Sequence, residues 1–191
     1  FEENKKLVEA IYTQFMLDYL NKEQWRNRIY SIEDNLKYII ENNGNRSNVL
    51  EKASSIINNA EKFIRFTTQY PVDPLLLQKL LKKAKLGVRI EILTSHEKDE
   101  FNYRKPFNFF NANLNNKLYA YHNIKRRYFP GKVHAKLLYS EKESLVGSDN
   151  ISIMLKLMQT KEDMLYVANN NFYTSQLSEF FELGWCKSNK D

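Results

Sequence analysis

Residues 62–93 read KFIRFTTQYPVDPLLLQKLLKKAKLGVRIEIL, in which two short apolar runs flank a helical pattern. The β-branched and aromatic residues at 62–68 and 88–93 predict strands. Between them, leucines recur at helical spacing over 74–86 and stop at Gly87, a residue typical of the position after a helix. Strands separated by a helix of this length indicate a βαβ unit. We therefore expect an α/β fold with a mixed, largely parallel sheet flanked by helices.

Helix and strand patterns alternate on both sides of this unit. Apolar residues at helical spacing predict helices at 3–20, 31–42, 48–60 and 171–185. Short apolar runs predict strands at 118–121, 136–139, 144–147 and 164–168, whereas the rest of 97–130 is expected to be mostly loop. We therefore divide the chain into an N-terminal helical arm or linker, residues 1–47, and a main domain, residues 48–191.

Length and composition exclude several classes of protein. The 191 residues, 42% of them hydrophobic, suit one domain with at most a small appendage, and no apolar run approaches the roughly 18 residues of a membrane helix. Cys186 is the sole cysteine, which excludes an intrachain disulfide, and three histidines are too few for most all-histidine metal sites. We expect neither a metal nor another cofactor. Residue 1 is Phe rather than Met, so we expect the parent chain to begin upstream, and we expect a cytoplasmic protein.

The charge is concentrated in one stretch. The chain carries +6, but residues 101–140 hold eight Lys or Arg and no Asp or Glu, which leaves −2 elsewhere. Such a basic stretch favours phosphate-bearing partners, either nucleic acid or a lipid headgroup, over the alternative of a merely solvated loop. Aromatic residues interleave with the basic ones there, and some of these rings could stack on nucleic-acid bases.

Two short segments carry the chemistry. Residues 133–139 read VHAKLLY, and alternation along a strand would place His134 and Lys136 on one face. The turn Gly147-Ser148-Asp149-Asn150 follows a second apolar run. An imidazole, an ammonium, an amide and a hydroxyl that converge suit a phosphate, because imidazole can attack phosphorus while the other groups hold its oxygens. A core histidine, a surface lysine and an ordinary turn would all have to coincide for this pattern to be accidental.

This arrangement resembles the phospholipase D superfamily, whose signature is His-x-Lys, then an Asp, then Gly-Ser-x-Asn. The resemblance covers roughly residues 48–186 and implies a phospholipase D-like fold. Glu141 stands where the family commonly has the Asp, and its spacing to Gly147 is one residue short. Related proteins often keep an acid oriented toward the histidine further downstream, which here would be Glu162 or Asp163, and we favour Glu162.

The resemblance implies a metal-independent, two-step phosphodiester transfer. One histidine attacks phosphorus to give a phosphohistidine, and a second histidine protonates the leaving oxygen. The reaction needs two copies of the motif and this chain has one, so we expect a homodimer with a shared active site. The alternative is a second copy in a longer parent chain.

Three classes of function remain. We favour an endonuclease on DNA or RNA, with His134, Lys136, Ser148, Asn150 and Glu162 as the catalytic set. The substrate-binding residues would be Lys125, Arg126, Arg127, Lys132 and Gly147. The alternatives are a phospholipid hydrolase or transphosphatidylase similar to cardiolipin synthase, and a non-catalytic ligand-sensing domain of a transcription regulator. The complete histidine, lysine and asparagine set argues against the sensor, since binding alone needs no nucleophile.

Overall fold

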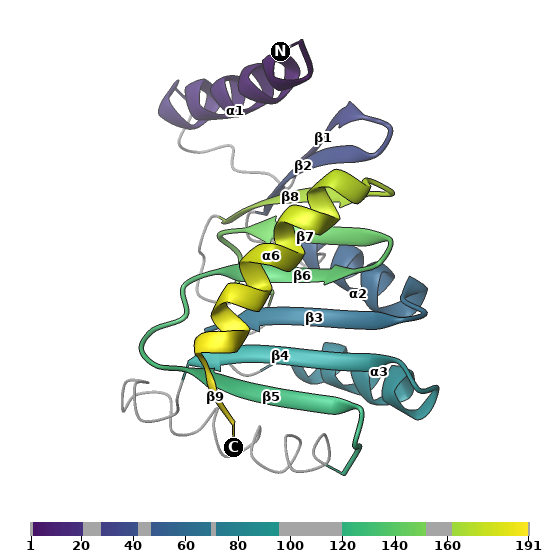
Figure 1. Cartoon of the computed structure of the whole chain (residues 1–191). Coiled ribbons are helices and arrows are strands. Elements are labelled where there is room, and N and C mark those ends of the chain that lie inside the picture. Colours follow the sequence, from purple (N-terminus) through teal and green to yellow (C-terminus); the bar gives the residue numbers. More distant parts are fainter. Residues whose placement is uncertain are drawn as a thin grey trace.

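The computed structural model describes residues 2–20, 28–41, 47–69, 72–95, 120–151 and 162–190, which form one mixed sheet with helices on both faces (Figure 1). In the described residues the sheet has nine strands in the order β1-β2-β8-β7-β6-β3-β4-β5-β9. The strands are β1 (Arg28–Glu33), β2 (Leu36–Glu41), β3 (Phe63–Thr68), β4 (Arg89–Ser95), β5 (Ile124–Phe129), β6 (Lys136–Ser140), β7 (Glu143–Gly147), β8 (Glu162–Ala168) and β9 (Asn189–Lys190). The helices are α1 (Glu2–Leu20), α2 (Asn48–Asn59), α3 (Pro74–Lys85) and α6 (Asn171–Lys187).

The sheet is mixed rather than largely parallel, so that part of the sequence prediction is wrong. Only the β3–β4 and β4–β5 pairs are parallel within the described residues, and the other pairs are antiparallel. For the β1–β2 and β6–β7 pairs the physical reason is connection length, because parallel neighbours need a long crossover whereas a short turn joins antiparallel ones. The β6–β7 turn contains only Glu141 and Lys142, and the β1–β2 turn only Asp34 and Asn35.

Helices cover the two faces differently (Figure 1). Helices α2 and α3 pack on one face, where they enclose the largest apolar cluster with Ile64, Phe66, Ile90, Ile92, Leu138 and Leu145 of the strands. Helix α6 crosses the other face and buries Phe181 and Trp185 against Leu93, Leu137 and Tyr139. The predicted helices at 48–60, 74–86 and 171–185 are therefore confirmed within one or two residues at their starts and ends.

Within the helix predicted at 31–42, residues 31–41 instead form most of the β1–β2 hairpin, and residue 42 lies outside the described residues. Apolar residues at 32, 36, 39 and 40 fit helical spacing, but they also fit a strand that is buried on both faces. Strand β2 pairs with β1 on one side and β8 on the other, and Ile39 and Ile40 are both 0% exposed on opposite faces. The hairpin thus belongs to the sheet. In the described part of residues 1–47, helix is confined to α1, and a division at residue 47 stays a proposal.

Helix α1 confirms the prediction for residues 3–20 and packs on the hairpin. Ala10, with Leu7 beside it, meets Ile32, Leu36, Tyr38 and Ile40, and the Tyr30 hydroxyl donates to Gln14 Oε1 at 3.1 Å.

Strand β5 lies in the stretch expected to be mostly loop. Its Ile124 and Tyr128 are buried, but Lys125, Arg126 and Arg127 between them mask the strand signal in the sequence. Pairing with β4 stabilises the strand. Of the strand predicted at 118–121, residues 120 and 121 lie outside any strand, and 118 and 119 lie outside the described residues.

Candidate active site

The two motif segments meet at one edge of the sheet. Strands β3 and β4 end at this edge, and β6 begins there because it runs antiparallel to β3, with Leu137 opposite Thr67. Lys136 lies opposite Gly147 in the β6–β7 pair, and Gly147 lies opposite Met164 in the β7–β8 pair. The fold therefore brings the His-x-Lys segment beside the Gly-Ser-x-Asn segment, at the carboxyl ends of the parallel strands, where α/β folds commonly bind ligands.

Lys136 is a buried cation at this edge. It is 3% exposed, and its Nζ donates to the His134 carbonyl oxygen at 2.6 Å. Burial lowers the pKa of Lys136, and the negative charge of Glu162 offsets part of that shift. The ammonium is thus held in a low-dielectric setting, where an approaching phosphate would interact with it strongly.

The segment that carries His134 is anchored to β4. The Val133 N–H donates to Ser95 Oγ at 2.8 Å, and both residues are buried, with Ser95 the last residue of β4. His134 itself is exposed and precedes β6, whereas Lys136 is buried, so the two side chains differ in solvent access. Sequence reasoning missed Ser95, although a polar residue at the carboxyl end of an apolar strand is the signal that could have identified it.

Gly147 and Ser148 hold β7 against β8. A Cβ on Gly147 would lie 2.1 Å from the Asp163 carbonyl oxygen, so a larger residue would force the two strands apart. The Ser148 N–H donates to the Asp163 carbonyl at 2.9 Å, and the Asp163 N–H donates to Ser148 Oγ at the same distance. Both residues therefore shape the site through the backbone, which is a structural task beyond the ligand contacts predicted for them.

The three candidate acids occupy different places. Glu162 lies close enough to Lys136 to act on its pKa. Asp163, the next residue on the strand, accepts a hydrogen bond from the Tyr38 hydroxyl at 2.8 Å and points to the opposite face. Of these two, Glu162 is the acid on the side of Lys136.

Glu141 lies at the other end of β6. At roughly 3.3 Å per residue, it is about 16 Å from Lys136 along the chain. Its carboxylate accepts hydrogen bonds from the backbone N–H groups of Glu61 and Phe63 at 2.7 and 3.3 Å. Burial alone would raise the pKa of Glu141, but these amide donors lower it overall. Glu141 thus joins the β6–β7 turn to the start of β3.

The predicted substrate-binding basic residues do not form one patch. In the β4–β5 register Lys125 lies opposite Glu91 and Arg127 opposite Leu93, on the face of α6, whereas Arg126 alternates to the other face. Arg127 Nη1 donates to the Trp185 carbonyl at 2.8 Å. Lys125 and Lys132 are exposed. Three further cations of the basic stretch 101–140, Arg104, Lys105 and Lys117, lie outside the described residues.

Two further observations concern metals and membranes. Among the described residues, no group of three or more His, Cys, Asp or Glu side chains is placed to hold a metal ion. No helix in the described part of the chain has the length and apolar character that crossing a membrane requires.

Comparisons with known proteins agree on the fold. Nuc, a phospholipase D family member from Salmonella typhimurium, has a TM-score of 0.62 at 16% identity, over 82% of this chain and 98% of Nuc. Phosphatidylserine synthase from Haemophilus influenzae Rd KW20 has a TM-score of 0.61 at 13% identity, over 98% of this chain and 47% of the synthase. TrmBL2, an archaeal chromatin protein with a novel mode of DNA binding, has a TM-score of 0.58 at 15% identity, over 100% of this chain and 64% of TrmBL2.

Sequence families give the assignment. No curated protein sequence matches the chain. The family model described as cardiolipin synthase, PLD-like domain, matches residues 54–185, which is more than half of the chain and includes both motif segments. The chain belongs to this family of PLD-like domains and so to the phospholipase D superfamily.

Proposed function

We propose that this chain is a phosphodiesterase of the phospholipase D type that cleaves nucleic acid, with His134 as its nucleophile. The observation that carries the proposal is the register of β6 and β7, which sets buried Lys136 directly opposite Gly147 and so beside the Ser148–Asn150 turn. Buried, perturbed titratable groups at a sheet edge are typical of functional sites.

Three motif residues, His134, Lys136 and Asn150, have a role in the proposed reaction. The neutral imidazole of His134 attacks phosphorus, and the bond from phosphorus to the leaving oxygen breaks. The protonated His134 imidazolium of a second copy gives that oxygen its proton and becomes neutral. Water then attacks the phosphohistidine, the P–N bond breaks, and the second imidazole takes the water's proton. Lys136 and Asn150 would hold the non-bridging oxygens throughout, where positive charge and amide donors stabilise the transition state.

Charge favours nucleic acid as the substrate. Residues 101–140 carry eight cations and no anions, a composition that suits a polyanionic partner, and Lys125 and Lys132 are exposed in the described part of this stretch. TrmBL2, which shares the fold and binds DNA, supports nucleic acid as the partner. Phosphatidylserine synthase also shares the fold, so a phospholipid substrate is the other outcome of the test.

A regulatory role is the second candidate. The likeness to TrmBL2 extends over 100% of this chain, whereas the likeness to Nuc extends over 82%. A ligand-sensing domain of a transcription regulator would keep the same sheet but would not turn over a phosphodiester.

Hydrolysis assays separate these functions. Bis(p-nitrophenyl) phosphate, plasmid DNA and phosphatidylcholine vesicles are each incubated with the protein and excess EDTA. We expect turnover of the first two, and His134→Ala should lose at least about 10³-fold in kcat, on the order of 4 kcal/mol, because the covalent route disappears.

His122→Ala is the matched control, since His122 is also an exposed histidine but lies outside the motif. Activity that EDTA abolishes, or that persists in His134→Ala, contradicts the mechanism. Turnover of vesicles but not DNA replaces the nuclease with a lipid enzyme, and no turnover of any substrate favours the regulator.

The need for two histidines predicts a homodimer. Sedimentation should show a dimer at the protein concentrations used in the assay, and a fully active monomer would contradict the shared active site.

A further inference from the structure

Asp149 is a buried carboxylate inside the second motif, between Ser148 and Asn150. It is 2% exposed, and its Oδ1 accepts a hydrogen bond from the Ile151 N–H at 2.6 Å. An Asp side chain that accepts from the backbone two residues ahead forms an Asx turn. A carboxylate acceptor makes such a bond shorter and stronger than a neutral one.

The turn ends on a strained residue. Ile151 has a φ of +52°, which is in the left-handed region that β-branched side chains rarely adopt. Its side chain is 1% exposed and packs in the main apolar cluster. Such a conformation persists only when its surroundings impose it, and here the core holds the side chain while Asp149 holds the N–H.

Asn150 lies between these two constraints. Its Oδ1 is buried and has no hydrogen-bond partner in the described part of the chain. This oxygen has lost its bonds to water without gaining one in the protein, and such a cost commonly marks a residue of a functional site. The donor that can hold a phosphate oxygen is the Nδ2 amide of the same carboxamide.

We propose that Asp149 is a positioning residue: its carboxylate sets the 149–151 turn and so orients the Asn150 carboxamide toward the substrate phosphate. This inference rests on the proposed function. The motif requires Gly, Ser and Asn and leaves this position open, so the role belongs to this chain's own residue. If the Asp149 carboxylate only stabilised the turn, its loss would lower the stability of the fold. If it is a positioning residue, its loss lowers kcat, and this effect depends on Asn150.

Four variants separate these roles. They are Asp149→Ala, Asp149→Asn, Asn150→Ala and the double variant Asp149→Ala/Asn150→Ala. With bis(p-nitrophenyl) phosphate and EDTA, Asp149→Ala should lose about 10–100-fold in kcat, because a small displacement of a group that contacts the transition state is costly. Asp149→Asn keeps an oxygen that can accept from Ile151 and should stay within about threefold of wild type. In the Asn150→Ala background, Asp149→Ala should cause no further loss, since coupled residues are not additive.

Three results would overturn the inference: an Asp149→Ala variant as active as wild type, no rescue by Asp149→Asn, or additive losses in the double variant. Thermal unfolding checks that each variant folds, and Asp149→Ser, whose hydroxyl makes a weaker version of the turn, replaces Asp149→Ala if the latter does not fold. The kcat of Asp149→Ser should then lie between that of wild type and that of Asn150→Ala.

A second measurement keeps this test separate from the proposed function. If the wild type turns over no phosphodiester, the proposed function fails, and ¹H–¹⁵N spectra still report the turn. Asp149→Ala should then shift the Ile151 amide and the Asn150 side-chain amide, and Asp149→Asn should leave both near their wild-type positions. Unchanged signals in Asp149→Ala would overturn the positioning role.

Discussion

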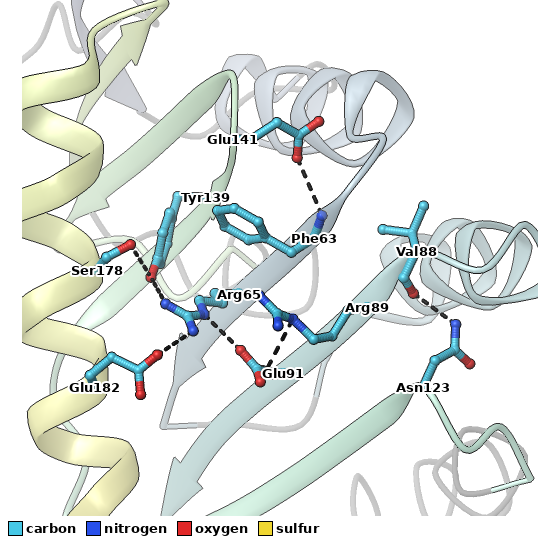
Figure 2. A network of polar contacts seen from close by, with 10 residues as sticks. All are labelled: Phe63, Arg65, Val88, Arg89, Glu91, Asn123, Tyr139, Glu141, Ser178 and Glu182. Carbon is cyan, nitrogen blue, oxygen red and sulfur yellow. Dashed lines mark hydrogen bonds and ion pairs between the residues drawn. The ribbon is translucent and has the colours of Figure 1, made fainter.

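Arg65 and Lys136 are both buried cations of the same sheet, but their surroundings differ. Arg65, on β3, is 8% exposed and donates to Glu91 Oε2 at 2.7 Å, to the Tyr139 hydroxyl at 3.0 Å and to Glu182 of α6 (Figure 2). Burial opposes its charge, but the bonds to Tyr139 and Glu91 outweigh burial and raise the pKa of Arg65. Its guanidinium is surrounded by partners that the fold itself supplies.

Lys136, on β6, is 3% exposed and donates to a backbone carbonyl, that of His134. Burial lowers its pKa, and Glu162 opposes the shift only in part. The partners of Arg65 thus stabilise its positive charge, whereas burial of Lys136 destabilises its charged form. Arg65 links α6 to the sheet through Glu182, whereas the charged form of Lys136 would be stabilised when an anion binds beside it.

The largest expected effect on stability comes from Arg65→Met. Removing the guanidinium takes from buried Glu91 its hydrogen-bonded cation and leaves it only Arg89 at 3.9 Å, which should lower the free energy of unfolding by about 3–5 kcal/mol. Urea denaturation measures the loss. Turnover per folded molecule should stay near wild type, because Arg65 bonds to Glu182 of α6 and lies opposite Tyr139, three residues along β6 from Lys136. A selective loss of kcat would contradict the comparison.

Lys136→Met should give the reverse pattern. We expect kcat to fall about 10²–10³-fold, or about 2.7–4 kcal/mol, because a preorganised cation at the phosphate is lost. The free energy of unfolding should not fall, since methionine replaces a buried charge with an apolar side chain. Steady-state kinetics and urea denaturation measure the two quantities. The control is Lys142→Met at the opposite edge, where an exposed lysine pairs with Glu61; equal kinetic losses in both variants would contradict the assignment.

The lowered pKa of Lys136 sets the sign of a pH dependence. The unfolded chain holds this proton up to about the ordinary value of 10.5, whereas the folded chain releases it earlier. Between the two pKa values the unfolded state binds more protons, so the stability of wild type relative to Lys136→Met should rise as pH increases toward 10.5. Denaturation at pH 8 and pH 10 tests this. A relative stability that falls over that range would show that the ammonium is stabilised as Arg65 is.

The smallest effect concerns the basic residues of β5. Lys125 is exposed, so Lys125→Ala should reduce the log–log slope of DNA affinity against salt by about one. Arg127 bonds to the Trp185 carbonyl and stacks on its ring at 4.6 Å, so Arg127→Ala should act mainly on the melting temperature through α6. Fluorescence anisotropy over a salt series measures the slopes, with the exposed Lys82→Ala on α3 as control. If the slope changes alike for Lys82 and Lys125, the basic stretch has no special place in binding.

Much of this molecule could be predicted from local sequence. The spacing of Val49, Ala53, Ile56 and Ile57 identifies α2, and Pro74 with Gly87 identifies the start and end of α3, because one apolar stripe and two end residues suffice to specify a helix. The His134–Lys136 and Gly147–Asn150 segments could be recognised as a pair for a similar reason, since each depends on residues close together in the chain.

Other features depend on partners distant in the sequence. The apolar residues of 31–42 fit a helix as well as a strand, and pairing with β8, more than 120 residues away, decides for the strand. Two-residue turns make the β1–β2 and β6–β7 pairs antiparallel, whatever the composition of their strands. Glu162 and Asp163 are adjacent acids in the sequence, but the pleat of β8 sends one toward Lys136 and the other to Tyr38. Local sequence determined which residues form helices, most strands and the motif, whereas tertiary pairing decided burial, strand direction and which neighbour each charge meets.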